Sequence, residues 1–449
     1  MNYGIGAPAG PPPAAVLNAR REKLLGAIGD GIAVLAAAPQ LHRSRDTEVI
    51  YRQDSNLYYL TGLAEPEAVA VLTPHDQEHR FTLFLRERDP EREAWNGPTL
   101  GLEGARERIG ATAAYPISEM HGRLPDLLRP APVIHFPFEH PRLQMLMPDM
   151  VARARSGRAR SGLGPAATQD LELHLERMRL IKDEDEIARM RVTAAIAVRG
   201  HRALMAAARP GMGEWELQSI MEAEFRKLGA AGPAFPSIVG SGTGATVLHY
   251  VDNDQRLEER ELVLVDAGAE WGMYCSDISR TFPVSGRFSE PQRELYEIVL
   301  AAQLAAISAA VPGAPITEVH QAALKELVPG MIRLGLLGAT DPEAVLESGE
   351  YRRFYLHQTS HWLGLDVHDI GLYQGDDQPV ILQPGMVLTV EPGLYVPANA
   401  DDVPEQYRGI GIRIEDDVLI TAEGNEVLTA ELEKEAADVE RVMRGNFEF

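Results

Sequence analysis

One stretch constrains this chain more than any other: residues 262–281, LVLVDAGAEWGMYCSDISRT. It opens with an apolar run typical of a buried strand that ends on Asp266, and a second strand-like run carries Asp277. Gly268 and Gly272 supply turn chemistry, and a hairpin would bring the two acids within about 5 Å of each other. Such a pair of carboxylates indicates a metal, a basic partner or simple exposure to water.

A second stretch, MVLTVEPG at residues 386–393, repeats this arrangement. It is again a β-rich run that closes on an acid, Glu391, and the return run GIRIE carries Glu415. Arg413 lies two residues before Glu415, so on a strand the two side chains share a face. Between the hairpins, the run HQTSHWLGLDVHD holds three histidines: His357, His361 and His368. Four acids on two hairpins with a histidine cluster between them predict a two-metal site.

The order and spacing of five of these residues resemble the metal ligands of the pita-bread metallopeptidases: Asp266, Asp277, His361, Glu391 and Glu415. The runs HWLGLDVHDIG, VLTVEPGLYV and PEQYRGIGIRIEDDVLIT look like bacterial aminopeptidase P, the Xaa-Pro aminopeptidases of family M24. Near the start, YRQDSNLYYLTGLAEPEAV resembles that family's amino-terminal domain. The resemblance implies an α/β (α+β) protein with an N-terminal α/β domain at residues 1–178 and a catalytic pita-bread domain at residues 179–449.

Composition limits the functions open to the chain. The net charge of −23 disfavours binding to nucleic acid or to an anionic membrane, and no apolar run is long enough to span a membrane. The N-terminus lacks the features of a signal peptide, and its proline and glycine content predicts a disordered lead over residues 1–15. The single cysteine, Cys275, fits a reducing cytoplasm and is expected to be a small buried filler.

The periodicity of apolar residues outlines the rest of the fold. It predicts a short helix at 19–29 and strands at 31–35, 68–72 and 81–85, an alternation that favours an α/β domain. One long helix is expected at 176–209, where the Pro-Gly pair at 210–211 ends it, and shorter helices are expected at 215–228, 289–311 and 316–334. Helices followed by an acid-bearing hairpin occur twice, which indicates two related halves.

A ligand set of four carboxylates and one imidazole is hard and oxygen-rich. It favours two Mn²⁺ ions, with Zn²⁺, Co²⁺ and Fe²⁺ as alternatives. By resemblance, Asp266 holds one metal, His361 and Glu391 hold the other, and Asp277 and Glu415 bridge them. Glu391 is then the candidate general base for hydroxide attack on a scissile carbonyl.

The same resemblance implies roles for residues around the metals. His249 and His368 would donate hydrogen bonds to the substrate, and Arg413 would hold the bridging carboxylates. Three residues lie where the family builds its proline pocket: His357, Tyr373 and Tyr395. Asp46 and Trp95 are expected to contribute to the substrate pocket of a neighbouring subunit, because family members form homo-oligomers, usually dimers or tetramers.

These inferences lead to a metal-dependent aminopeptidase that releases the first residue of peptides with proline at position two. An Xaa-Pro dipeptidase (prolidase) on the same fold is the nearest alternative, and a metal-free pita-bread binding module is a remote one. Two departures from the family bear on the preferred substrate length. Gln358 stands where glycine is common, and Asp376 and Asp377 stand where some relatives carry a basic residue.

Other motifs carry less weight. HQTSH has the histidine spacing of a zincin but lacks the glutamate of H-E-x-x-H. The loop GSGTG at 240–244 is not clearly followed by a helix and has no lysine, so a nucleotide site is disfavoured. A methionine aminopeptidase would not need the N-terminal domain.

Overall fold

The computed structural model describes residues 4–375 and 377–444, so Asp376 lies outside the described residues. Two compact units make up the chain. One extends from Pro11 to Met178, and the other joins the start of the chain, up to Gly10, to everything from Arg179 onward. Among the described residues, no helix has both the length and the apolar character needed to cross a membrane.

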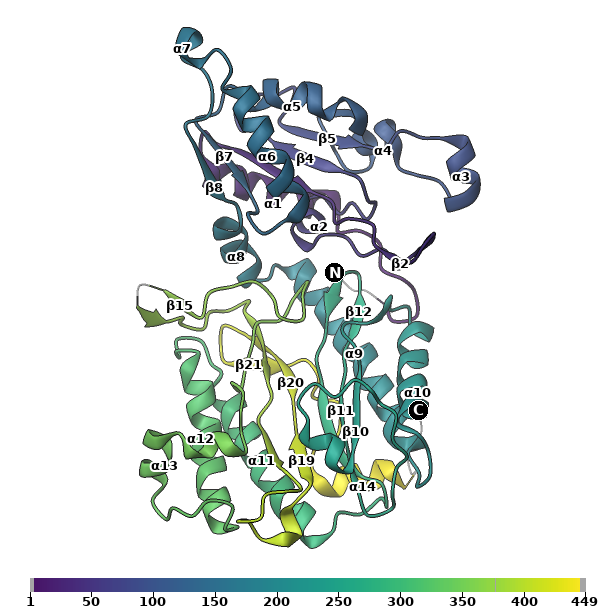
Figure 1. The fold of residues 1–449 in the computed structure, drawn as a ribbon, viewed down its shortest axis with the longest axis vertical. Helices are drawn as coiled ribbons and strands as arrows, with labels where there is room; N and C mark the ends of the chain where they lie inside the picture. The colour runs from purple at the N-terminus through teal and green to yellow at the C-terminus, as the bar shows by residue number, and fades with distance from the viewer. Residues whose placement is uncertain (1–3, 376, 445–449) are drawn as a thin grey trace. The chain divides into compact units, whose positions relative to one another are not determined.

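The unit at 11–178 is built on a mixed six-stranded sheet (Figure 1). In spatial order its strands are β6 Ala113–Pro116, β5 Phe81–Leu85, β4 Val69–Leu72, β1 Ile32–Ala36, β7 Val133–Phe136 and β8 Ala167–Asp170. The β1–β4 and β4–β5 pairs are antiparallel, whereas β1–β7, β7–β8 and β5–β6 are parallel. A small exposed hairpin lies outside this sheet: β2 His42–Ser44 and β3 Thr47–Glu48. The predicted α/β domain is confirmed.

Alternate residues of the central strand serve the two faces of this sheet. Ile32, Val34 and Ala36 of β1 pack in one core with α5 and α6, because side chains alternate along a strand. Both faces are covered, so β1, β4 and β5 are buried along their whole length. The helices of this unit are α1 Ala14–Ile28, α2 Ser55–Thr61, α3 Pro90–Asn96, α4 Gly101–Glu107, α5 Met120–Leu128, α6 Pro141–Ala154 and α7 Arg158–Ser161.

The N-terminal lead differs from the disordered segment that its composition predicts. The Gly6 N–H donates to the Leu228 carbonyl at 3.0 Å, and the Trp271 indole N–H donates to the Ala7 carbonyl at 2.8 Å. The Arg189 guanidinium donates to the Gly10 carbonyl at 3.0 Å. Proline and glycine content does not reveal these bonds, because the donors lie far along the chain. Residues 1–3 of the predicted lead lie outside the described part of the chain.

Helices of the second unit flank its strands on both sides in Figure 1. They are α9 Glu184–Ala207, α10 Glu214–Lys227, α11 Glu290–Ala309, α12 Thr317–Arg333, α13 Pro342–Ser348 and α14 Ala436–Met443. The expectation of one long helix at 176–209 was wrong. This stretch is instead two helices, α8 Glu172–Leu180 and then α9. Between them, the Asp183 carboxylate accepts a hydrogen bond from the Glu186 N–H, and the Glu186 carboxylate accepts one from the Asp183 N–H, both at 3.0 Å. This capping box starts a new helix.

The strands of this unit form two similar double hairpins. In the first, β11 Leu262–Asp266 pairs with β14 Ser279–Pro283, and β12 Ala269–Trp271 pairs with β13 Tyr274–Cys275. In the second, β17 Val387–Val390 pairs with β20 Asp416–Ile420, and β18 Gly393–Val396 pairs with β19 Ile410–Arg413. Shorter strands extend these sheets or lie in loops: β9 Gly232–Pro233, β10 Ile238–Ser241, β15 Gln374–Gly375, β16 Gln378–Pro379 and β21 Asn425–Val427. Each double hairpin therefore breaks once along both of its arms.

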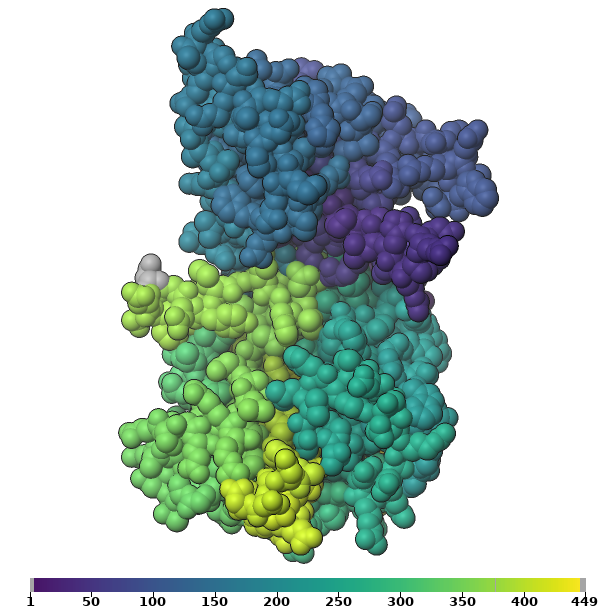
Figure 2. Space-filling view, viewed as in Figure 1, coloured from purple at the N-terminus to yellow at the C-terminus, as the bar shows by residue number. Residues whose placement is uncertain are grey.

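The predicted pair of related halves agrees with this arrangement. In Figure 2 the first half, in teal, occupies one side of the unit and the second half, in light green, occupies the other. One continuous core of buried residues includes side chains from both halves, among them Val265 and Phe282 from the first and Leu388 and Val418 from the second. The site described below lies where the two sets of strands face each other.

Gly268 lies in the break between β11 and β12 and has no room for a side chain. A Cβ there would lie 1.5 Å from the Ser276 carbonyl oxygen, so backbone would have to move. We expect Gly268→Ala to lower the free energy of unfolding by about 3 kcal/mol or more. Gly338→Ala is the control, because nothing lies within 4 Å of its added Cβ. Urea unfolding of the two variants measures the difference, and equal stabilities would contradict the close approach.

Candidate metal centre and active site

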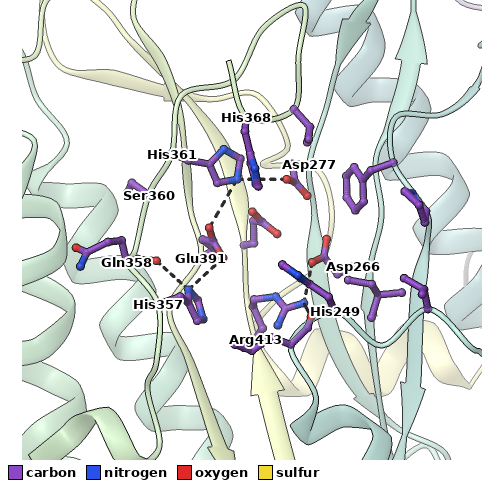
Figure 3. A pocket seen from close by; sticks show the side chains of 17 residues that line it. His249, Asp266, Asp277, His357, Gln358, Ser360, His361, His368, Glu391 and Arg413 are labelled. Atoms are coloured by element: carbon purple, nitrogen blue, oxygen red, sulfur yellow. Dashed lines mark hydrogen bonds and ion pairs between the residues drawn. The ribbon is translucent and has the colours of Figure 1, made fainter. Parts of the chain in front are cut away.

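The four predicted acids lie at the breaks of the two double hairpins. Asp266 ends β11 and Asp277 lies between β13 and β14, whereas Glu391 lies between β17 and β18 and Glu415 between β19 and β20. A break turns consecutive side chains away from the regular alternation, so the acids of both halves point into one space (Figure 3). His361 joins them from the segment before β17, where its N–H donates to Thr389 Oγ1 at 3.1 Å.

This space is a cavity of about 560 Å³. Nine of the sequence-predicted residues line it: His249, Asp266, Asp277, His357, His361, His368, Glu391, Arg413 and Glu415. The remaining wall is largely apolar, with Phe235, Pro236, Ile238, Leu248, Val251 and Val367, and it also includes Gln358 and Ser360. These apolar residues could not be predicted from the sequence, because apolar residues that line a cavity follow the same local pattern as those that fill a core.

His361 is oriented to offer one nitrogen to the cavity. Its Nδ1 lies 3.0 Å from the carbonyl oxygen of Trp362, which can only accept, so Nδ1 carries the proton. Its Nε2 faces the acids, 3.5 Å from Asp277 Oδ2 and 3.7 Å from Glu391 Oε1. A histidine that donates from one nitrogen and presents the other unprotonated is arranged as a metal ligand.

The carboxylates fit a cation site. Ligand atoms of Asp277, His361 and Glu415 lie within 4.8 Å of one another. Burial, together with repulsion from neighbouring acids, raises the pKa of Asp277 and of Glu415 well above the usual range, and burial raises the pKa of Glu391 to about 7. Asp266 Oδ1 and Asp277 Oδ1 are buried and receive no hydrogen bond from the described residues. A divalent cation would compensate these charges.

Arg413 ties the two halves together beside the acids. Its guanidinium donates to Asp266 Oδ2 at 2.7 Å and to Ser279 Oγ at 2.8 Å, and Ser279 in turn donates to Glu415 Oε2 at 2.7 Å. The predicted contact of Arg413 with the bridging acids is therefore made through Ser279, and its direct partner is Asp266. Ser279 was not predicted, although its position two residues after Asp277 is a usable signal.

His357 and Tyr395 form a hydrogen-bonded chain with Arg413. Arg413 Nη1 donates to the Tyr395 hydroxyl at 2.9 Å, and that hydroxyl lies 2.8 Å from His357 Nε2. His357 Nδ1 lies 2.8 Å from the Gln358 carbonyl oxygen, so Nδ1 donates and Nε2 accepts from the tyrosine. Burial and the nearby Arg413 lower the pKa of His357 to about 4, which keeps its imidazole neutral at pH 7.

Several predicted residues are not among those that line the cavity. Tyr395 is buried behind it, and the Tyr373 hydroxyl accepts from the Trp362 N–H at 3.0 Å. Asp46 and Trp95 belong to the other unit, where both are exposed, Trp95 to 89%. Asp377 is exposed, and its neighbour Asp376 is not described.

A further buried acid contacts the backbone of Asp277. Asp417 is buried, and its two carboxylate oxygens lie 3.2 and 3.3 Å from the backbone nitrogen of Asp277. It lies two residues after Glu415, one strand step beyond a predicted ligand. Asp417 was not predicted, although its position two residues after Glu415 is a usable signal.

The raised pKa of Glu391 gives a stability prediction for the metal-free protein. Because this pKa is about 7 in the folded state and about 4.5 when unfolded, the folded state binds more protons between those pH values. The carboxyl group therefore reduces the free energy of unfolding as pH rises through this window, by about 3 kcal/mol in total. We expect metal-free Glu391→Gln to gain stability relative to metal-free wild type from pH 5 to pH 8.

Urea unfolding in the presence of a chelator measures this difference. Subtracting the free energy of unfolding of the wild type from that of the variant removes the pH dependence of the buried histidines, because both proteins contain them. Added divalent cation should stabilise the wild type more than the variant. A difference between the two proteins that does not change with pH would contradict the raised pKa.

Comparison with known proteins assigns this site to a family. Residues 188–422 match Metallopeptidase family M24, and residues 17–135 match the Aminopeptidase P, N-terminal domain. The chain is 42% identical over 427 residues to the Xaa-Pro aminopeptidase of Escherichia coli, covering 94% of this chain and 96% of that protein. It is 43% identical over 402 residues to the Xaa-Pro aminopeptidase of Haemophilus influenzae, covering 89% of this chain and 90% of that one.

Solved structures agree with the sequence comparison. The Pseudomonas aeruginosa aminopeptidase PepP superposes with a TM-score of 0.94 at 41% identity, over 97% of this chain and 99% of that one. The predicted fold, an N-terminal α/β domain followed by a pita-bread domain, is thereby confirmed. The chain belongs to metallopeptidase family M24 and carries the N-terminal domain of aminopeptidase P.

Proposed function

We propose that this protein is an Xaa-Pro aminopeptidase that releases the first residue of peptides with proline at position two. The observation that carries the proposal is the convergence of Asp266, Asp277, His361, Glu391 and Glu415 on one cavity. Relatives with this activity in their names are matched over nearly the whole chain. The proposal therefore rests on a site and on a family that agree.

We assign two divalent cations to this site, with Mn²⁺ favoured by the oxygen-rich ligand set. Asp266 would hold one cation, and His361 and Glu391 would hold the other. Asp277 and Glu415 would bind both. Such a pair, when bound, supplies Lewis acidity and makes a nucleophile available from water at neutral pH.

The chain's own residues then act on the peptide. Glu391 faces the centre of the cavity and is placed to accept the proton of the attacking water and pass it to the leaving amine. His249 and His368 are exposed within the cavity and can donate to the carbonyl and amide of the scissile bond. Arg413 keeps Asp266 and Ser279 in place through the bonds described above.

Proline at position two suits this cavity for a physical reason. The Xaa-Pro amide is tertiary and has no N–H, so a site that requires that donor rejects it. Here the wall is largely apolar, and its polar groups include His249 and His368, which can serve as donors to a carbonyl. Neither feature demands an N–H at the scissile bond.

A comparison of two peptide classes tests the function. Protein loaded with Mn²⁺ should release the first residue from Xaa-Pro-Xaa tripeptides and leave Xaa-Pro dipeptides largely intact. The reverse preference would make the protein a prolidase. If neither peptide class were cleaved, both the aminopeptidase and the prolidase function would be rejected. Xaa-Ala-Xaa tripeptides are the matched control for proline, and we expect them to be poor substrates.

We also propose a homo-oligomer in the cytoplasm. The exposed Trp95 and Asp46 would then complete the substrate pocket of a neighbouring subunit, and the single cysteine suits a reducing compartment. Trp95→Ala should raise KM more for long peptides than for tripeptides. An unchanged KM for every peptide length would remove Trp95 from the site.

A further inference from the structure

A buried cluster of charges lies outside the cavity, against the segment that carries His361 and His368. Arg179, at the end of α8, and Lys182, just before α9, both contact the carboxylate of Asp369. Lys182 Nζ lies 3.1 Å from Asp369 Oδ2, and Arg179 Nη2 donates to Oδ1. The three side chains are at most 2% exposed. Arg179 also donates to Asp366 at 2.7 Å.

Asp369 directly follows His368, so the cluster fixes the backbone beside a cavity residue. The Asp369 N–H donates to the Trp362 carbonyl at 2.9 Å, which closes residues 362–369 into a loop. At the start of this loop, the Thr389 N–H donates to the His361 carbonyl at 2.9 Å. The imidazoles of His361 and His368 pack edge to face, with ring centroids 4.4 Å apart. His368 thus lies in a closed loop, directly before the buried Asp369.

Close packing inside the loop supports the same interpretation. A Cβ on Gly364 would lie 2.2 Å from Asp369 Oδ2 and 3.1 Å from Lys182 Cε. The carboxylate and the lysine stem therefore fill the space that a side chain at residue 364 would need. The Lys182 N–H donates to the Gly385 carbonyl at 2.8 Å, so the lysine is itself anchored just before β17.

We propose that Arg179, Lys182 and Asp369 form a positioning device that sets the orientation of the His368 imidazole in the cavity. This inference rests on the proposed function, in which His368 donates to the substrate. Buried ion pairs contribute little net stability, because desolvation offsets their attraction, and apolar replacements often serve the fold as well. We therefore expect the cluster to fix the position of His368 rather than to stabilise the fold. Its three residues do not touch the substrate and act only through His368.

A double-mutant cycle tests the proposal. Asp369→Asn should lower kcat about 10- to 100-fold, with little change in KM or in bound metal, as outer partners of site residues do. In a His368→Ala background the same substitution should have no further effect, because the group through which it acts is gone. Equal losses of kcat in both backgrounds would show a general structural effect and overturn the proposal.

Lys182→Met provides a second variant if Asp369→Asn does not fold, because it leaves the Arg179–Asp369 pair in place. It should cause a smaller loss of kcat in the same direction, again absent in the His368→Ala background. Asp402→Asn is the control, since Asp402 forms an exposed ion pair with Arg353 at 2.8 Å. Its kcat should equal that of the wild type.

NMR of the histidine imidazoles separates failure of this inference from failure of the proposed function. The His368 signal, identified by its loss in His368→Ala, should shift in Asp369→Asn and stay unchanged in Asp402→Asn. This readout needs no turnover. If wild-type protein cleaved no peptide, the proposed function would fail while the shift still decided the placement of His368, and an unmoved signal would overturn the positioning role.

Discussion

Replacing Asp277 with asparagine, or Glu415 with glutamine, should abolish peptidase activity and reduce the amount of bound metal. Both residues are buried and lie among other acids that repel them. Each amide removes one negative charge and turns N–H donors toward the place of a cation. We expect kcat/KM to fall at least about a thousandfold, equivalent to about 4 kcal/mol of barrier.

Metal content by atomic emission and kcat/KM on a Xaa-Pro-Xaa tripeptide measure the two effects. Asp401→Asn is the matched control, because its side chain is 94% exposed and should behave as the wild type does. Full turnover by Asp277→Asn or Glu415→Gln would sink the two-metal assignment. Since removing charge relieves repulsion, the metal-free variants should also be more stable than the metal-free wild type.

Replacing His249 with alanine should lower turnover and leave the metal content intact. His249 is exposed within the cavity and is not one of the five proposed metal ligands. Loss of one donor to a developing charge lowers kcat about 100- to 1,000-fold. We expect the loss in kcat, with KM changed less, because the donor acts most strongly on the transition state.

Steady-state kinetics with metal analysis on the same samples test this expectation. His121→Ala, at an exposed position in the other unit, is the control and should be fully active. Loss of metal from His249→Ala would instead make this residue part of the structure of the metal centre.

The convergence of the four acids and His361 on one cavity could be predicted from the sequence, because each acid follows or precedes a strong strand signal. The strands ending near Asp266 and Glu391 are continuous β-branched and leucine-rich runs, and the acids stand where those runs stop. The breaks themselves could not be predicted. Asp277 and Glu415 were expected on regular strands, yet both lie between two short strands. Only pairing with the other arm shows where a strand stops and resumes.

Features held by long-range contacts escaped the sequence analysis. Ser279 and Asp417 contact Glu415 and Asp277 of the opposite half, and the apolar cavity wall combines residues far apart in the chain. The helix interruption at 181–183 was missed for another reason. The run continues the apolar period of a helix, but Asp183 and Glu186 have the spacing of a capping box, a usable sequence signal that their reciprocal hydrogen bonds confirm.

The hydrogen bonds of residues 6–10 have a consequence for how this chain is made. Gly6, Ala7 and Gly10 precede the unit at 11–178, yet their partners Leu228, Trp271 and Arg189 are synthesised after that whole unit. The full set of three bonds can therefore form only after synthesis has passed residue 271. A fragment that begins at residue 179 lacks this segment and leaves the Trp271 and Arg189 donors without those carbonyls. We expect a long tag fused ahead of Gly6 to slow the docking of residues 6–10.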